Sequence, residues 1–349
     1  MSHLIEKWKA HRVASFFLLT LALNFLLLTP VVLLRDSLET PVVGLYTFYA
    51  GRLAVYSPVL IGMLMVRWLN PDRSLGSTTR RRVLFWAVWA VALAVFVLEA
   101  QDGLDEAGFG LEALVVFSLP IALLPAWVVS SALGRYAGIR EYLSTLIRPR
   151  GHVIWYLIAL FAFPVIHLVG HLATQLVTGE PLFADIRLTS EVLAATLLAF
   201  VFVFFYSGGI NEEGGWRGFA QNQLQRTHSP LTANLLLYIG LVVWHIPNDI
   251  FQYADGGYIR VRIILYPFIV ILFGWVYNRT NGSILAVAFF HASMNSTNTL
   301  QEAIPATTTA SVLLILFAVY AVASDRMWKK LPSSHTKGSQ PVVTSSQRP

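Results

Sequence analysis

Residues 190–210 read SEVLAATLLAFVFVFFYSGGI, and Asn211-Glu212-Glu213 follow directly. The first segment is apolar over about 20 residues, the length that a helix needs to cross the hydrocarbon core of a membrane. Charged side chains at membrane depth are costly unless they are paired or line a wet cavity. We therefore expect a membrane helix that leads into a functional polar site.

The composition of the whole chain also indicates a membrane protein. Of its 349 residues, 56% are hydrophobic and only 13% are charged, whereas soluble domains carry about 25% charged residues. Apolar blocks recur near residues 13–34, 42–66, 83–100, 111–134, 153–178, 190–210, 231–252, 261–278, 283–300 and 308–324. We expect an all-α, polytopic transmembrane bundle of about ten spans. The first block is too long for a signal-peptide core, so we interpret it as an anchor.

The net charge is +6, which in a soluble protein would suggest a nucleic-acid partner. Basic residues in the short loops of a membrane protein instead set its orientation, so we expect membrane lipids and no nucleic acid as partners. The sequence contains no cysteine, which excludes disulfides, thiol catalysis and thiolate metal sites.

Loop charges predict the orientation of the helices. Basic residues precede the first block, separate the second from the third and the fourth from the fifth, and follow the tenth: Lys7, Lys9, Arg12, Arg73, Arg80, Arg81, Arg82, Arg135, Arg140, Arg148, Arg150, Lys329 and Lys330. Because cytoplasmic loops are enriched in Lys and Arg, we expect a multi-pass protein of the cell membrane with both termini in the cytoplasm. Arg260 and Arg262 break the pattern, since they fall on the predicted outer side.

The chain shows no internal repeat, and we divide it into three parts. Residues 1–186 hold N-terminal helices without an identified motif. Residues 187–325 hold the polar motifs and the final span. Residues 326–349 are rich in Ser, Thr, Gln and Pro and are expected to form a disordered cytoplasmic tail.

The first polar motif is the glutamate pair with the arginine that follows. Glu213 and Arg217 are four residues apart, so on a helix they share a face and can form an ion pair. Glu212 is rotated by about 100° from Glu213 at about 3.6 residues per turn and can face another partner. The alternative is a charged helix start at the membrane surface, where carboxylates favour the helix dipole.

Two further motifs place histidines in apolar blocks. His245 lies inside block 231–252, close to Pro247, which favours a kink that exposes backbone polar groups. His291 and Asn295 are four residues apart on one helix face, which Asn298 extends. The alternative for these residues is hydrogen-bonded packing between helices.

His167 and His171 have the i, i+4 spacing of a metal site. No nearby motif supplies the glutamate of the zinc-protease pattern, so we favour a structural or cavity-lining role. For Arg52, inside the second block, we expect that the side chain is paired or reaches the membrane surface.

Together the motifs resemble the CPBP family, which comprises CAAX prenyl endopeptidases and bacteriocin-processing or self-immunity proteins (the Abi family). The family pattern is Glu-Glu-x-x-x-Arg, Phe-x-x-x-His and His-x-x-x-Asn. The matching residues, within roughly 190–300, are Glu212, Glu213, Arg217, Leu241, His245, His291 and Asn295. Leu241 replaces the usual aromatic residue, and Gly214-Gly215 replaces larger side chains.

The resemblance implies an intramembrane endopeptidase that cleaves a membrane-associated or lipidated protein. It assigns water activation to Glu212 and His245, the oxyanion site to His291 and Asn295, and support to Glu213 and Arg217. It also implies a metal-independent glutamic protease without a cofactor, although these side chains could bind zinc.

Two other functions stay open. One is a catalytically silent scaffold or bacteriocin self-immunity protein that binds a peptide or sensor partner in the same cavity. The other is a transporter, because polar residues at depth also mark substrate paths, but the absence of a repeat argues against it.

The expected spans leave a difference in depth between two motifs. Glu212 falls near the cytoplasmic end of the sixth span, whereas His245 lies about 14 residues into the seventh, roughly 21 Å deeper. We therefore expect that helix 211–226 dips into the bilayer or that the sixth and seventh spans begin later.

Overall fold

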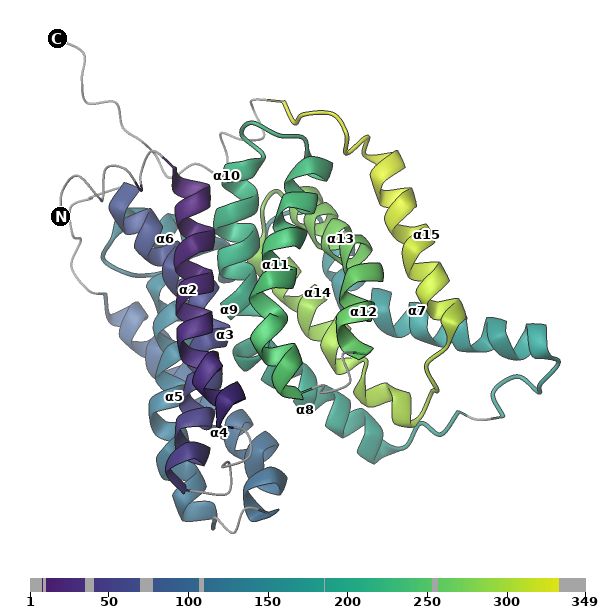
Figure 1. Cartoon of the computed structure of the whole chain (residues 1–349), viewed down its shortest axis with the longest axis horizontal. Helices are drawn as coiled ribbons and strands as arrows, with labels where there is room; N and C mark the ends of the chain where they lie inside the picture. Colours follow the sequence, from purple (N-terminus) through teal and green to yellow (C-terminus); the bar gives the residue numbers. More distant parts are fainter. Residues whose placement is uncertain are drawn as a thin grey trace.

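The chain is helical throughout the part that the computed structural model describes, which comprises residues 8, 11–34, 41–69, 78–106, 110–184, 186–252 and 257–332 (Figure 1). Each of the ten apolar blocks coincides with helical structure, which confirms the all-α bundle. Met327 is buried and its carbonyl accepts the Leu231 N–H, so the packed chain extends just past the expected boundary at residue 325. Residues 333–349 of the expected tail lie outside the described residues.

The helical elements follow one another along the chain with short connections. They are α2 (Arg12–Leu33), α3 (Pro41–Leu69), α4 (Thr79–Glu106), α5 (Leu111–Ser131), α6 (Ala137–Leu143), η2 (Ser144–Leu146), α7 (Ile154–Thr178), α8 (Ser190–Tyr206), α9 (Ile210–Glu213), η3 (Gly214–Gln221), α10 (Asn222–Leu224), α11 (Pro230–Gln252), α12 (Gly257–Ile264), α13 (Tyr266–Arg279), α14 (Ile284–Ser296), η4 (Thr299–Glu302) and α15 (Thr308–Ser324).

Seven helical stretches of the described chain are long and apolar enough to cross a membrane, which makes this a multi-pass membrane protein. They are α2, α3, α4, α5, α7, α11 and the continuous run Ser190–Leu224. The eighth and ninth apolar blocks form shorter helices than expected, whereas α15 spans the whole tenth block. The eighth block is divided between α12 and α13, and α14 has only 13 residues, about 20 Å against a hydrocarbon core of about 30 Å. Of about ten expected spans, the described chain has seven helices of membrane length together with a group of shorter apolar helices.

The run Ser190–Leu224 removes the difference in depth between Glu212 and His245. Elements α8, α9, η3 and α10 form one 35-residue stretch with a bend after α8, where Gly208 has a φ of +129°. Glu212 therefore lies inside a membrane-length helix and not at its end. From Gly214 the helix has π geometry, which is rare and occurs often at functional sites.

The N-terminal helix α3 packs closely against the π-helix. A Cβ atom on Gly215 would lie 2.3 Å from the Pro58 backbone, and one on Gly214 would lie 2.6 Å from the Val59 side chain. The two glycines are therefore required by the approach of α3, and larger residues do not fit here.

Two polar contacts join basic residues of the expected cytoplasmic segments to other parts of the bundle. Arg12, at the start of α2, donates to Gln223 of α10 over 3.3 Å, and these segments meet at the top of Figure 1. Arg150 donates to the carbonyl of Asn281, between α13 and α14, over 3.4 Å. Arg262 is not a loop residue, because it is buried in α12 and pairs with Asp249 of α11. Its departure from the charge pattern reflects this pairing.

Candidate active site

A cavity of about 440 Å³ lies among α2, α3, α11, α14 and the bend of the 190–224 helix. Its wall includes Glu212, His245, His291 and Asn295, the four residues that the family resemblance assigns to catalysis. Glu212 and the two histidines are buried from the outer surface. Three sequence motifs that lie far apart in the chain therefore meet at one internal space.

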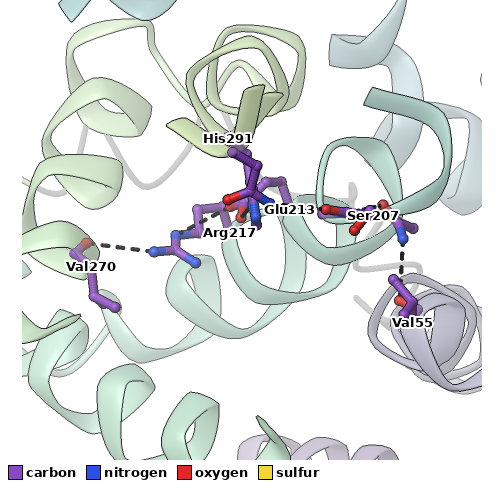
Figure 2. Close-up of polar contacts among 9 residues, drawn as sticks. Val55, Ser207, Glu213, Arg217, Val270 and His291 are labelled. Atoms are coloured by element: carbon purple, nitrogen blue, oxygen red, sulfur yellow. Dashed lines mark hydrogen bonds and ion pairs between the residues drawn. The ribbon is translucent and has the colours of Figure 1, made fainter. Parts of the chain in front are cut away.

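Glu213 connects two of these motifs (Figure 2). Its Oε1 accepts a hydrogen bond from Nδ1 of His291 at 2.7 Å, and its Oε2 lies 3.4 Å from Nε of Arg217. The contact with Arg217 is the ion pair expected from their spacing, although it lacks the geometry of a directed hydrogen bond. The sequence did not indicate the contact between Glu213 and His291.

Arg217 is held on two further sides. Its Nη2 donates to the Val270 carbonyl over 3.5 Å, as Figure 2 shows, and its guanidinium lies 4.8 Å from the centre of the Phe273 ring. Both partners belong to α13. Arg217 thus fixes the π-helix to α13 while it balances the charge of Glu213.

Glu212 differs from its neighbour in having no polar partner. It forms no hydrogen bond or ion pair with any residue that the structure describes, and its side chain lines the cavity. One glutamate is thus occupied and the other is available to a bound molecule.

The tautomer of His245, which lines the cavity, is fixed by a hydrogen bond to the backbone. Its Nδ1 lies 2.8 Å from the Leu241 carbonyl, which can only accept, so Nδ1 carries the proton and Nε2 of a neutral ring holds a lone pair. This bond goes to the backbone one turn earlier, so the replacement of the family's aromatic residue by Leu241 does not disturb it. Trp244 and Tyr266 pack edge-on against the imidazole.

The bend after α8 is shaped around His291 and Asn295. A Cβ atom on Gly208 would lie 2.2 Å from Nε2 of His291, so only glycine fits there. Asn295 donates from Nδ2 to the Ser207 carbonyl at 3.2 Å, and Asn211 accepts from the Gly208 N–H at 3.1 Å. The bend is therefore tied both to α14 and to the start of α9.

Tyr142 of α6, outside the membrane spans, supports the π-helix from the other side. Its hydroxyl donates to the Gly214 carbonyl. Burial raises the pKa of this phenol well above its usual value, so the hydroxyl keeps its proton and remains a donor. Gly62 of α3 makes room for the hydroxyl, since a Cβ there would lie 2.3 Å from it.

Residues 194–297 match a family model described as type II CAAX prenyl endopeptidase Rce1-like. The chain contains an Rce1-like domain. No curated protein matches the chain. The matched residues include all the motifs of the CPBP resemblance but not α2 and α3, which supply part of the cavity wall.

The cavity of the Rce1-like domain has further polar residues that sequence reasoning did not assign to it. They are Asn24, Arg52, Asn248, Arg262 and Tyr266. Asn24 of α2 donates to the Trp244 carbonyl at 2.6 Å and so joins the first helix to the histidine-bearing α11. The only signal in the sequence was the presence of these polar residues inside apolar blocks or beside them.

Other expected polar residues of the chain lie away from this cavity. Asn298 is exposed and accepts a hydrogen bond from Gln301 at 3.1 Å. His167 contacts the Ile304 carbonyl through Nε2 at 2.6 Å, and neither it nor His171 lines the cavity of the Rce1-like domain. The described residues contain no group of three or more His, Cys, Asp or Glu that could hold a metal ion.

Proposed function

We propose that this protein is an intramembrane endopeptidase that cleaves a membrane-associated or lipidated polypeptide. The observation that carries the proposal is the meeting of Glu212, His245, His291 and Asn295 on one cavity wall. The description of the matching family as a prenyl endopeptidase supports it. The N-terminal helices belong functionally to the site, because α2 and α3 close the cavity.

In the proposed reaction, Glu212 acts as the general base. A water between Glu212 and Nε2 of His245 loses a proton to the carboxylate as its oxygen attacks the scissile carbonyl carbon. The C–N bond then breaks, and Glu212 returns the proton to the leaving amine. Two groups suit this role: a carboxylate without another partner and an imidazole whose tautomer is fixed by Leu241.

The developing oxyanion needs hydrogen-bond donors. Asn295 uses one N–H on Ser207 and has a second to offer. His291 directs Nδ1 to Glu213, and when it is protonated on both nitrogens its Nε2 can donate as well. Glu213 supplies the balancing negative charge, which is why we assign it and Arg217 to support and not to proton transfer.

The competing function is a silent scaffold that binds a peptide or sensor partner in the same cavity. The test uses purified full-length protein with a peptide that ends in a prenylated cysteine motif and with its unprenylated counterpart. Glu212→Gln keeps the shape and removes the base, so cleavage is expected to fall at least about a hundredfold. Glu191→Gln, an exposed glutamate at the start of α8, is the matched control. Cleavage that persists in Glu212→Gln removes the assignment, and binding without cleavage by the wild type favours the scaffold.

A further inference from the structure

Arg52 of α3 lies on the wall of the same cavity as Glu212. Its guanidinium carbon is 5.1 Å from the centre of the Phe96 ring of α4 and 5.1 Å from that of the Phe202 ring of α8. It forms no hydrogen bond or ion pair with any residue that the structure describes. Arg52 was expected to be paired or to reach the membrane surface, and the structure shows that its guanidinium contacts aromatic rings of two other helices.

The other two arginines near the site are paired with carboxylates. Arg217 lies beside Glu213, and Arg262 contacts both carboxylate oxygens of Asp249. Arg52 forms no such pair with a carboxylate of the described residues. Arg52 is therefore the arginine of this cavity whose N–H groups are not taken by a carboxylate.

A second unpaired donor accompanies Arg52. The Tyr206 hydroxyl is buried and has no hydrogen-bond partner among the described residues, whereas the Tyr56 hydroxyl is used by the Phe205 carbonyl. Buried donors without partners are costly, and most are satisfied in folded proteins. Tyr206 does not line the cavity, whereas Arg52 is half-buried and lines it, so a ligand that accepts hydrogen bonds would be held by Arg52.

The chemistry of guanidinium identifies the ligand as an anion. A cation inside a membrane protein is costly unless it is paired, and such residues usually mark functional sites. The two rings pack against the guanidinium, whose N–H groups match the two oxygens of a carboxylate. A peptide substrate brings carboxylates into this cavity. A carboxylate of the substrate would balance the charge of Arg52 and accept its hydrogen bonds.

We propose that Arg52 binds a carboxylate of the substrate and so determines which peptide bond reaches Glu212. That the bound molecule is a substrate rests on the proposed function. The binding of a carboxylate by Arg52 does not. Ligand cavities of about 300–1,000 Å³ hold small molecules, so a cavity of about 440 Å³ takes only a few peptide residues. The carboxylate must therefore lie within a few residues of the scissile bond.

The test measures binding to the purified full-length protein in detergent micelles by titration calorimetry. The probes are acetyl-Ala-Val-Ile-Ala with a free carboxylate, its C-terminal amide, and acetyl-Ala-Val-Asp-Ala amide. The C-terminal amide of acetyl-Ala-Val-Ile-Ala carries no carboxylate. The third peptide carries a carboxylate only on its Asp side chain. We expect at least one carboxylate peptide to bind roughly tenfold more tightly than the uncharged amide. The tighter of the two shows whether the site takes a chain end or a side chain.

Variants assign the preference to Arg52. Arg52→Gln is expected to bind all three peptides as weakly as the wild type binds the uncharged amide peptide. Arg52→Lys keeps a positive charge beside the rings but loses the planar guanidinium that can donate two parallel hydrogen bonds. This variant should therefore fold and retain only part of the preference for carboxylate peptides. Arg67→Gln is the control, because Arg67 lies on the same helix and stacks on Tyr136 at 4.8 Å outside the cavity.

The outcomes separate this inference from the proposed function. Equal binding of acid and amide peptides by the wild type overturns the inference, as does a preference that survives both Arg52 variants. Displacement of the acid peptide by a short-chain phosphatidic acid, with no preference for acid over amide, would assign the site to a lipid instead. Glu212→Gln should keep the carboxylate preference. If it does while the wild type cleaves no peptide, the endopeptidase proposal fails and the role of Arg52 stands.

Discussion

Glu213 holds His291 through a 2.7 Å hydrogen bond between two helices that lie 78 positions apart in the chain. Both side chains are buried. Because the same carboxylate also faces Arg217, the orientation of the histidine depends on the charge balance of the π-helix. A substitution at any of the three residues should therefore change the position or the interactions of the other two.

The ion pair of Glu213 and Arg217 is expected to be energetically coupled. Glu213→Gln and Arg217→Gln should each lower the free energy of unfolding by about 3–5 kcal/mol, because each leaves a buried charge unpaired. The double variant should lose less than the sum of the two, with a coupling of about 0.5–3 kcal/mol. The measurement is a double-mutant cycle by denaturant unfolding in detergent.

The control cycle combines Glu213→Gln with Arg279→Gln, since Arg279 pairs with Asp325 elsewhere. That pair of changes should be additive. Additivity for Glu213 and Arg217 as well would mean that they do not interact, and it would weaken the argument that leaves Glu212 available.

Gly208→Ala should abolish activity. The new methyl group would lie 2.2 Å from Nε2 of His291, so either the ring or the bend must move. Gly179→Ala is the matched control, because Gly179 also has a positive φ, +77°, but has nothing within 4 Å of the position of a Cβ. The control should lose about 1 kcal/mol of stability and keep its activity. Equal loss of activity in both variants would assign the effect to backbone strain and not to His291.

Activity should survive strong chelation. We assign water activation to a carboxylate and an imidazole, so EDTA or phenanthroline should leave the rate of cleavage unchanged. Loss of cleavage that zinc restores would reverse the assignment. His167 and His171 would then return as candidate ligands.

Tyr142→Phe should destabilise the protein by about 1–3 kcal/mol, because the buried Gly214 carbonyl loses its donor. The pKa of Tyr142 is raised in the folded state, so folding favours the protonated phenol. Its stabilising effect is complete below the ordinary value of 10.0 and declines as the pH rises above it. Unfolding measured between pH 7 and 11 should show the wild type and the variant converging. A constant difference over that range would remove the role of this hydroxyl as a neutral donor.

The sequence predicted the membrane bundle and the contact between Glu213 and Arg217, because both depend on local spacing. Helix periodicity also separated Glu212 from Glu213. The contact of Glu213 with His291 was not predictable, since it joins α9 to α14 and depends on how those helices pack. The lengths of the individual helices were less predictable, because block length alone does not reveal that α14 ends after 13 residues.

Residues outside the motifs were also misplaced for a physical reason. Arg262 looked like a loop charge because its partner, Asp249, lies 13 positions away on another helix. For Arg52, which was expected to be paired or to reach the surface, the aromatic neighbours were not predictable because they belong to α4 and α8. Long-range pairing leaves no periodic signal in a single sequence.

The close approach of α3 to the π-helix limits which chimeric proteins can be built from this chain. With Gly215 set directly against the Pro58 backbone, an N-terminal half taken from another protein must bring a helix with the same local contour. A hybrid that joins residues 187–325 to unrelated membrane helices would retain every motif residue and still lack part of the cavity wall. Transplanting α2 and α3 together with residues 187–325 keeps all the residues that line the cavity.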